Sequence, residues 1–197
     1  DASPGPYWDA TDACCAAING HGPRDDVAYI DGLIDAANAH GFDSSRIVLL
    51  GLSNGAFMAH RYACERGNRI KGIIAVHGVG WNDFVGHCSS NSYTPSILQI
   101  SEILDTTVSY TGGDLGSGAY PGAELSSERW AQRSGCTDVS TASHAILNPS
   151  ISLSGATYRR EFTCPHNRVA EWATYGGGHM PTLSDQFMGE ALAFMGV

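Results

Sequence analysis

A serine set between two glycines is the first feature of this chain that could do chemistry. Ser53 is the centre of a G-x-S-x-G motif at residues 51–55. A nucleophilic serine on a sharp strand-to-helix turn requires very small residues two positions to either side. An apolar run at residues 47–50 precedes the motif, and residues 56–65 follow it without Gly or Pro. We therefore predict a strand, a tight turn carrying Ser53 as nucleophile, and a helix. A tight turn with no chemistry is the alternative interpretation.

A serine nucleophile needs a base to accept its proton and an acid to orient that base. His179 stands in a G-G-G-H stretch after a predicted strand that ends near Tyr175, and Asp105 follows a predicted strand that ends near Ser101. The order Ser, Asp, His along the chain is that of the α/β-hydrolases. His179 would take the hydroxyl proton and return it to the leaving group, while Asp105 would fix the imidazole tautomer and stabilise its charged form.

Other side chains compete for the roles of acid and base. Glu102 or Asp114 could be the acid, and Asp105 could instead only begin a turn. His77 and His87 also follow a predicted strand, so both are alternatives for the base. A histidine base predicts that activity falls on acidification through about pH 6 to 7.

The oxyanion hole of such an enzyme needs two N–H donors, and the sequence offers only one clearly. The backbone N–H of Asn54, the residue after the nucleophile, would be the first donor. Residues 1–24 contain no convincing strand to carry the second, so the loop at His21-Gly22 or the His-Gly-Val-Gly loop at residues 77–80 would have to supply it. Loss of one donor typically costs about 3 to 4 kcal/mol of transition-state stabilisation. The alternative to an enzyme is therefore a non-catalytic binding or scaffold protein that kept the strand-to-helix turn at Ser53, which we call the elbow.

The elements that must position these side chains alternate between strand and helix patterns. We predict helices over residues 26–40, 56–65 and 187–195, and strands at residues 47–50, 70–76, 96–101 and 169–175. This alternation implies an α/β fold with a mainly parallel sheet and helices on both faces. In such a sheet, catalytic groups gather beyond the carboxyl ends of the strands. No low-complexity segment or charge run divides the chain, so we interpret residues 1–197 as a single α/β-hydrolase-like catalytic domain.

Composition excludes some partners. The net charge is −9, and the eleven basic residues are scattered, which disfavours binding to nucleic acid or to an anionic membrane. No apolar stretch approaches the ~20 residues of a membrane span. The chain starts D-A-S-P-G-P, without Met or a signal-peptide core, so we expect a mature or trimmed product. Covalent serine chemistry implies neither a metal nor an organic cofactor.

The six cysteines favour disulfides, and so an exported protein, because no C-x-x-C pair suggests zinc binding. Cys136 with Cys164 is the preferred bridge, while the pairing of Cys14, Cys15, Cys64 and Cys88 stays open. Reduced, buried thiols in a cytosolic enzyme are the alternative.

Several stretches spread over the chain match one family in its order. They are W-D-A-T-D-A-C-C (8–15), D-D-V-A-Y-I (25–30), G-L-S-N-G-A-F-M (51–58), L-D-T-T-V-S-Y-T-G-G (104–113) and G-G-G-H-M-P (176–181). With these stretches the chain resembles the secreted polyhydroxybutyrate depolymerase and feruloyl esterase group of α/β-hydrolases. The resemblance implies Ser53 as nucleophile, Asp105 as acid and His179 as base. It also implies hydrolysis of carboxylic esters that are short-chain, feruloyl-type or part of a polyester.

The chain also departs from that family. Ser101, Glu102 and Ile103 stand where the family usually has His-Gly-Thr, and Met180 leads straight to Pro181 where the family usually has an intervening Trp. Family members carry roughly half a sheet before the nucleophile, and this chain lacks it. The chain is then the C-terminal part of a larger protein, a natural minimal hydrolase, or one copy of a homodimer that pairs along the exposed edge of the strand at residues 47–50.

Aromatic side chains are candidates for binding the substrate. Trp81 and Tyr110 are the two that we assign to an apolar cleft, although large aromatics more often belong to the core. The same choice between cleft and core applies to three further aromatics: Tyr120, Trp130 and Trp172. A peptidase is the runner-up among enzymes, but nothing in the sequence indicates a cleft for an extended peptide.

Overall fold

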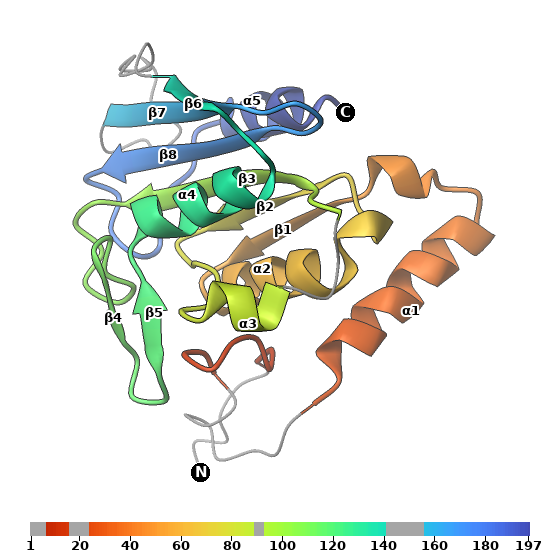
Figure 1. Cartoon of the computed structure of the whole chain (residues 1–197), viewed down its shortest axis with the longest axis horizontal. Coiled ribbons are helices and arrows are strands. Elements are labelled where there is room, and N and C mark those ends of the chain that lie inside the picture. Colours follow the sequence, from red (N-terminus) through yellow and green to blue (C-terminus); the bar gives the residue numbers. More distant parts are fainter. Residues whose placement is uncertain (1–6, 16–23, 89–92, 141–155) are drawn as a thin grey trace.

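A mainly parallel sheet forms the centre of the molecule (Figure 1). The computed structural model describes residues 7–15, 24–88, 93–140 and 156–197. Within them, a six-stranded sheet has the order β1-β2-β3-β8-β7-β6, and β4 and β5 form a separate pair. The parallel strands are β1 (Val48–Leu52), β2 (Gly72–Val76), β3 (Ser96–Glu102) and β8 (Val169–Tyr175). The antiparallel ones are β7 (Ala156–Thr163), β6 (Asp138–Ser140), β4 (Gly112–Asp114) and β5 (Ala119–Pro121).

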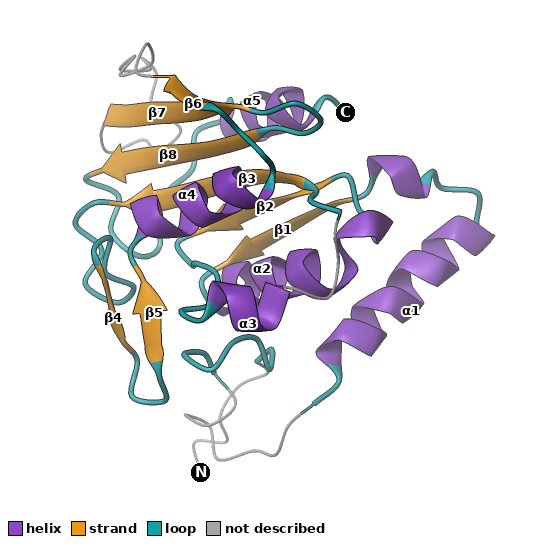
Figure 2. Ribbon diagram, viewed as in Figure 1, coloured by secondary structure: helices purple, strands orange, loops and turns teal. Residues whose placement is uncertain are grey.

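Helices cover both faces of this sheet (Figure 2). On one face, Ile73 and Ile97 join a buried cluster with α2 (Asn54–Arg66) and α4 (Ala123–Arg133). On the other face, Ile74 and Leu98 pack in a second cluster with α5 (Phe187–Met195). Every residue of β2 and β3 is buried, as expected for strands covered on both sides. The predicted α/β class is confirmed.

The helix before the elbow begins where its sequence predicts. In α1 (Asp26–Ala39), the Asp25 side chain caps the N-terminus by accepting from the Ala28 N–H at 2.9 Å. Val27, Ile30 and Ile34 form its buried stripe. The remaining helical elements are α3 (Phe84–Cys88) and two 3₁₀ turns, η2 (Ser44–Arg46) and η3 (Gly67–Arg69).

Two elements, α4 and β7, were not predicted from the sequence. The centre of β7 holds two adjacent charged residues, Arg159 and Arg160, which interrupt any apolar strand pattern. In the fold, the Arg159 guanidinium lies 4.0 Å from the centroid of the Trp172 ring and the Arg160 guanidinium bonds to Glu128 at 2.5 Å. Arg159 also forms an ion pair with Glu190, so both arginines have acidic partners far away in the sequence.

Three disulfides join the six cysteines. Cys136 pairs with Cys164, the bridge preferred from the sequence, and connects the segment after α4 to the end of β7. Cys64–Cys88 links α2 to α3, and Cys14–Cys15 joins neighbours in the N-terminal segment. The described helices include none with the length and apolarity needed to cross a membrane.

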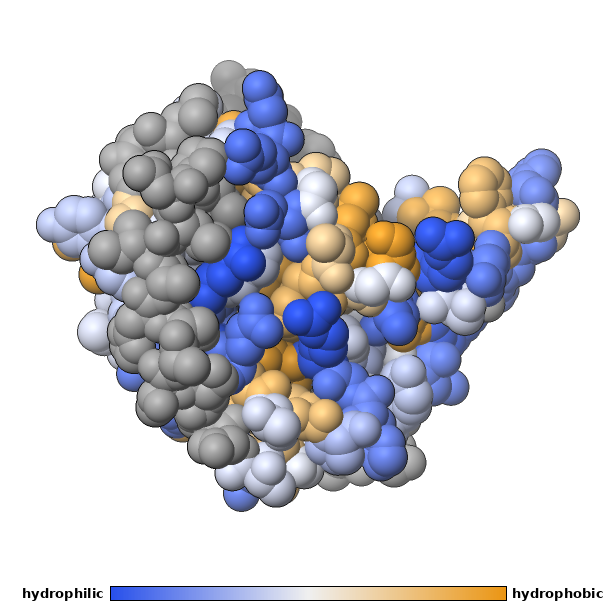
Figure 3. Space-filling model, turned by 90° about the horizontal axis from the view of Figure 1, so that it is seen from above, coloured by the Kyte–Doolittle hydropathy of each residue, from blue (hydrophilic) through white to orange (hydrophobic). Residues whose placement is uncertain are grey.

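The sheet has an open edge at β1. Among the described residues, no strand pairs with β1 on the side away from β2. Leu50 is 50% exposed and Leu52 37%. Beside this edge lies an apolar groove of about 390 Å³, lined by Ile30 and Leu33 of α1, by residues 47–50 and by Met58 of α2. Figure 3 shows a projecting arm set off from the body of the molecule by a notch with apolar side chains at its margin.

Candidate active site

The turn that carries Ser53 is a strained strand-to-helix corner. Ser53 has φ 54° and ψ −120°, a positive-φ conformation that residues other than glycine seldom adopt. Its N–H donates to the Val76 carbonyl at 2.8 Å, and its own carbonyl accepts from the N–H groups of Ala56 and Phe57 at 2.8 and 3.2 Å. These bonds to β2 and to α2 hold the backbone of Ser53 in place, and so fix the position from which its hydroxyl projects.

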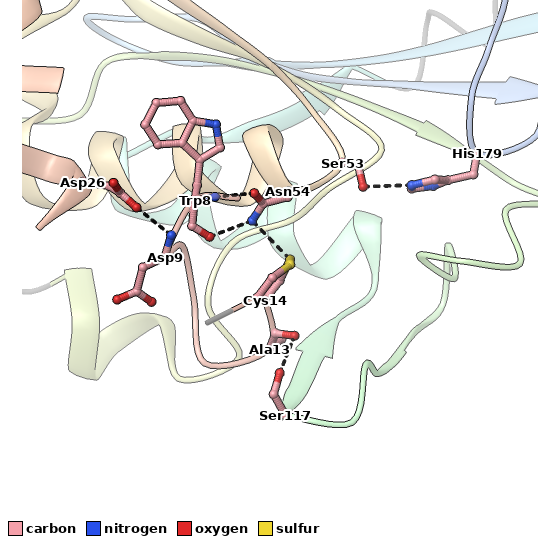
Figure 4. Close-up of a disulfide and its surroundings, with 10 residues drawn as sticks. Trp8, Asp9, Ala13, Cys14, Asp26, Ser53, Asn54, Ser117 and His179 are labelled. Carbon is pink, nitrogen blue, oxygen red and sulfur yellow. Dashed lines mark hydrogen bonds between the residues drawn. A yellow bond between two sulfur atoms is a disulfide. The ribbon is translucent and has the colours of Figure 1, made fainter. Parts of the chain in front are cut away.

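Three side chains from different loops meet at this corner. The His179 Nε2 lies 2.9 Å from the Ser53 Oγ, and the His179 Nδ1 lies 2.7 Å from the Asp105 Oδ2. The residues follow β1, β3 and β8, whose carboxyl ends share one edge of the sheet. Figure 4 shows the Ser53 and His179 side chains pointing toward one another. With the Nδ1–H donating to the carboxylate, Nε2 presents a lone pair to the serine hydroxyl.

The Asp105 carboxylate has two functions in the fold. Its Oδ2 accepts from His179, while its Oδ1 accepts from the N–H groups of Thr107 and Val108 at 2.7 and 3.0 Å. The side chain is almost fully buried. Asp105 therefore both begins a turn and faces the imidazole, the two interpretations that the sequence had set against each other.

The competing acids are engaged elsewhere. Glu102 is buried and accepts from the N–H groups of Gly176 and Gly177. Asp114 is exposed in β4 and accepts from the Gly116 N–H at 2.6 Å. Neither lies against an imidazole in the contacts of the described residues, so Asp105 is the carboxylate that faces His179.

The two competing histidines differ in how they lie relative to the site. His87 stacks on Trp81 with ring centroids 3.7 Å apart and lies 3.4 Å from Asp12. His77 adjoins the site: its Nδ1 is 2.8 Å from the His179 carbonyl oxygen and 4.0 Å from the Asp105 Oδ2. Burial lowers the pKa of His77, so the neutral ring donates its Nδ1–H to that carbonyl.

His77, Asp105 and His179 bring ligand-type atoms within 4.8 Å of one another, the spacing of a metal site. The hydrogen bonds already use the facing atoms, because both Nδ1 atoms donate to oxygen and the His179 Nε2 faces Ser53. The arrangement suits proton transfer between side chains.

The oxyanion donors are only partly accounted for. Asn54 is the first residue of α2, where backbone N–H groups have no intrahelical acceptor. In the 77–80 loop, the His77 N–H donates to the Ile100 carbonyl at 2.8 Å and the Gly80 N–H to the Ser126 Oγ at 3.2 Å. Two of the four amides in that loop are thus used by the fold. The His21-Gly22 alternative lies outside the described residues.

An N-terminal segment, residues 7–15, lies against the elbow. This packing was not predicted from the sequence. The Asn54 side chain accepts from the Trp8 N–H at 2.6 Å, donates to the Trp8 carbonyl at 2.9 Å and lies 3.4 Å from the Cys14 Sγ. Ser117 donates to the Ala13 carbonyl at 2.8 Å (Figure 4). The matched stretch at residues 8–15 was the sequence signal for this segment, but it carried no indication of where the segment packs.

The predicted aromatic candidates divide between core and site surroundings. Trp130 and Trp172 are fully buried in the two core clusters, and Tyr120 is buried beside Phe57. Trp81 is buried under the His87 ring, and the Tyr110 hydroxyl donates to Glu171 at 2.7 Å. Their role in binding a substrate stays a prediction.

Comparisons with known proteins address the fold. No family model matches the chain, and no curated protein matches its sequence. A solved structure, an acetyl xylan esterase from Aspergillus awamori, is similar with a TM-score of 0.60 and 16% identity. The match covers 90% of this chain and 68% of that chain. At this identity the likeness supports the α/β architecture alone.

Proposed function

We propose that this protein is a serine esterase that hydrolyses carboxylic esters through an acyl-enzyme on Ser53. The chief support is the continuous chain of hydrogen bonds from the Ser53 Oγ through His179 to Asp105, at 2.9 and 2.7 Å. A strained serine at a strand-to-helix corner adds to it, since such strain concentrates at functional sites.

The proposed reaction has two steps. The Ser53 Oγ attacks the ester carbonyl carbon while the His179 Nε2 accepts its proton, and Asp105 stabilises the imidazolium. The N–H of Asn54 donates to the oxyanion. Collapse of the tetrahedral species breaks the bond to the alcohol, which leaves with the proton held by His179. Water then attacks the acyl group in the same way, releasing the carboxylic acid and restoring the serine hydroxyl.

The substrate class in this proposal is a short-chain, feruloyl-type or polyester substrate. It follows from the family resemblance, and the name of the similar acetyl xylan esterase agrees with a short acyl group. The three disulfides support an extracellular location.

Hydrolysis of p-nitrophenyl acetate by the protein and by Ser53→Ala tests the mechanism. We expect turnover to fall about 1,000-fold or more in Ser53→Ala, because removing a triad member leaves only residual catalysis. The exposed Ser45 provides a matched control, and Ser45→Ala should keep full turnover. Equal turnover in Ser53→Ala and the parent protein would exclude this nucleophile.

A non-catalytic binding or scaffold protein is the second candidate. The observation that favours it is the use of the His77 and Gly80 amides within the fold, which leaves the second oxyanion donor unassigned. A phosphonate ester probe separates the two candidates, because it labels only an activated serine. Covalent labelling at Ser53 supports the esterase, and a folded but unlabelled protein supports the rival.

A further inference from the structure

A buried carboxylate lies between the two loops that carry Asp105 and His179. Glu102 is the last residue of β3 and is 1% exposed. Glutamate is almost never fully buried unless its charge is compensated. The ion pairs among the described residues do not include Glu102, so its compensation must come from hydrogen bonds.

Four donors surround this carboxylate. The Oε1 accepts from the N–H groups of Leu104 and Gly176 at 3.2 and 2.8 Å. The Oε2 accepts from the Thr174 hydroxyl and the Gly177 N–H, both at 2.9 Å. Leu104 directly precedes Asp105, and the two glycines precede His179 by two and three positions. One side chain therefore ties together the backbones that carry the acid and the base.

The loop at residues 176–179 needs such an anchor. Gly176 has φ 102° and Gly178 φ 64°, conformations that glycine adopts readily and other residues do not. Consecutive glycines also have the greatest conformational freedom to lose, so the loop's own backbone does little to select this shape. Glu102 fixes the start of the loop, and the His77 ring fixes its end at the His179 carbonyl.

We propose that Glu102 is a positioning residue, whose carboxylate holds the 176–179 loop against the Asp105 turn so that the His179 Nε2 meets the Ser53 Oγ. This inference deepens the proposed esterase function and rests on it. Glu102 stands where the resembled family usually has glycine, so the role arises from a departure of this chain.

The carboxylate is required because all four partners donate. An ionised carboxylate is a pure acceptor, whereas an amide has one acceptor and one donor end. In Glu102→Gln, the NH₂ group must face at least one N–H of the loop, and that N–H loses its acceptor inside the protein. The loop then shifts, and His179 moves away from Ser53.

Kinetics of Glu102→Gln give the first test. We expect kcat for p-nitrophenyl acetate to fall about 100-fold with KM nearly unchanged, because a displacement near 1 Å costs on that order. Unchanged kcat in folded Glu102→Gln overturns the positioning role.

Proton NMR gives a readout that does not depend on turnover. The His179 Nδ1–H, bonded to a buried carboxylate at 2.7 Å, should give a far-downfield resonance. We expect this resonance in the parent protein and in Ser53→Ala, and its loss or broadening in Asp105→Ala and Glu102→Gln. The matched control is Glu171→Gln, which alters another buried carboxylate of the same sheet and should retain the resonance. A sharp, unshifted resonance in Glu102→Gln contradicts the proposal.

Amide hydrogen exchange keeps the test valid if Glu102→Gln does not fold. In the parent protein, the Gly176 and Gly177 amides should exchange slowly, although Gly176 is exposed, because both donate to Glu102. Fast exchange of both amides overturns the anchor. A protein with protected amides and the downfield proton but no ester turnover would refute the esterase function while leaving the positioning role intact.

Discussion

Gly51 and Gly55 face each other across the Ser53 turn, and they are not equivalent. A Cβ atom on Gly51 would lie 2.0 Å from the Gly55 carbonyl oxygen, whereas outside its own helix the nearest atom to a Cβ on Gly55 is the Trp8 Nε1 at 3.9 Å. A clash with backbone cannot be relieved by rotating a side chain. The first glycine of the motif is therefore required by close packing, and the second is not.

Substitution by alanine should separate the two glycines. In Gly51→Ala the corner must shift, so we expect about 100-fold lower ester turnover and a free energy of unfolding about 1 to 3 kcal/mol lower. In the control Gly55→Ala, unfolding free energy should stay level or rise by up to about 1 kcal/mol, since alanine favours the first turn of α2. Urea unfolding and p-nitrophenyl acetate assays measure both effects. Equal losses in the two variants would refute this steric explanation.

Stability should depend on pH through His60. The ring is fully buried in α2, and its Nδ1 accepts from the Trp130 Nε1 at 2.9 Å. Burial lowers the pKa of His60 from 6.5 to about 3. Below about pH 6.5 the unfolded chain therefore binds a proton at His60, whereas the folded protein does not. The contribution of His60 to the free energy of unfolding is complete above that pH and is lost as the pH falls toward 3. The lowered pKa of His77 acts with the same sign.

Urea unfolding at pH 7 and pH 5 measures this dependence. Between them, His60 alone should reduce the free energy of unfolding by about 2 kcal/mol, at about 1.4 kcal/mol per pH unit below its unfolded pKa. In His60→Asn, an amide oxygen can still accept from Trp130 but no longer titrates, so the difference should shrink by that amount. The same pH dependence in His60→Asn would show that another group is responsible.

The expected homodimer would form by strand pairing along β1. In the part of the chain that the structure describes, one edge of β1 has no partner strand, and the exposed Leu50 and Leu52 lie beside the apolar groove; such an edge favours strand addition by a second copy. Light scattering should give twice the chain mass for the parent protein and a single mass for Leu50→Lys. The control Leu125→Lys changes a leucine of similar exposure on α4 and should leave the dimer intact. A monomeric parent protein at working concentration would remove the expectation.

The sequence predicted the part of the fold that its apolar runs encode. The strands at 70–76, 96–101 and 169–175 are mainly apolar, each interrupted by a charged or polar residue such as Lys71, Gln99 or Glu171, as expected where helices cover both faces of the sheet. The strand β7 was missed because its arginines satisfy their charges through partners distant in sequence. The helix α4 was missed because its buried face includes Ser126 and Ser127. Neither arginines with distant partners nor buried serines produce a periodic apolar pattern in the sequence.

The same limit applies to the candidate site. The three side chains that meet at the Ser53 corner were predicted from a motif and from their places after strands. The contacts of Glu102 could not be predicted, since its carboxylate oxygens accept from Gly176 and Gly177, more than 70 residues away in the sequence. From the sequence, Glu102 was only an alternative to Asp105 as the acid that orients His179.

The bond pair between Asn54 and Trp8 should hold the N-terminal segment on the elbow. The Asn54 amide both accepts from and donates to the Trp8 backbone, and the Asp9 N–H donates to Asp26 at 2.7 Å. In Asn54→Ala the first two bonds disappear and leave part-buried backbone groups unpaired, which typically costs about 1 to 3 kcal/mol. The loss falls on residues 7–15, so it should appear as local opening before global unfolding.

Limited proteolysis followed by mass spectrometry detects that opening. We expect Asn54→Ala to be cleaved within residues 7–15 about 10-fold faster than the parent protein, because about 1.4 kcal/mol of local stability corresponds to that factor when opening is fast. The control Asn38→Ala removes an exposed asparagine at the end of α1 and should not change the rate. Cleavage of Asn54→Ala at the parent rate would mean that the segment is held by its other contacts, such as the bond from Ser117 to Ala13.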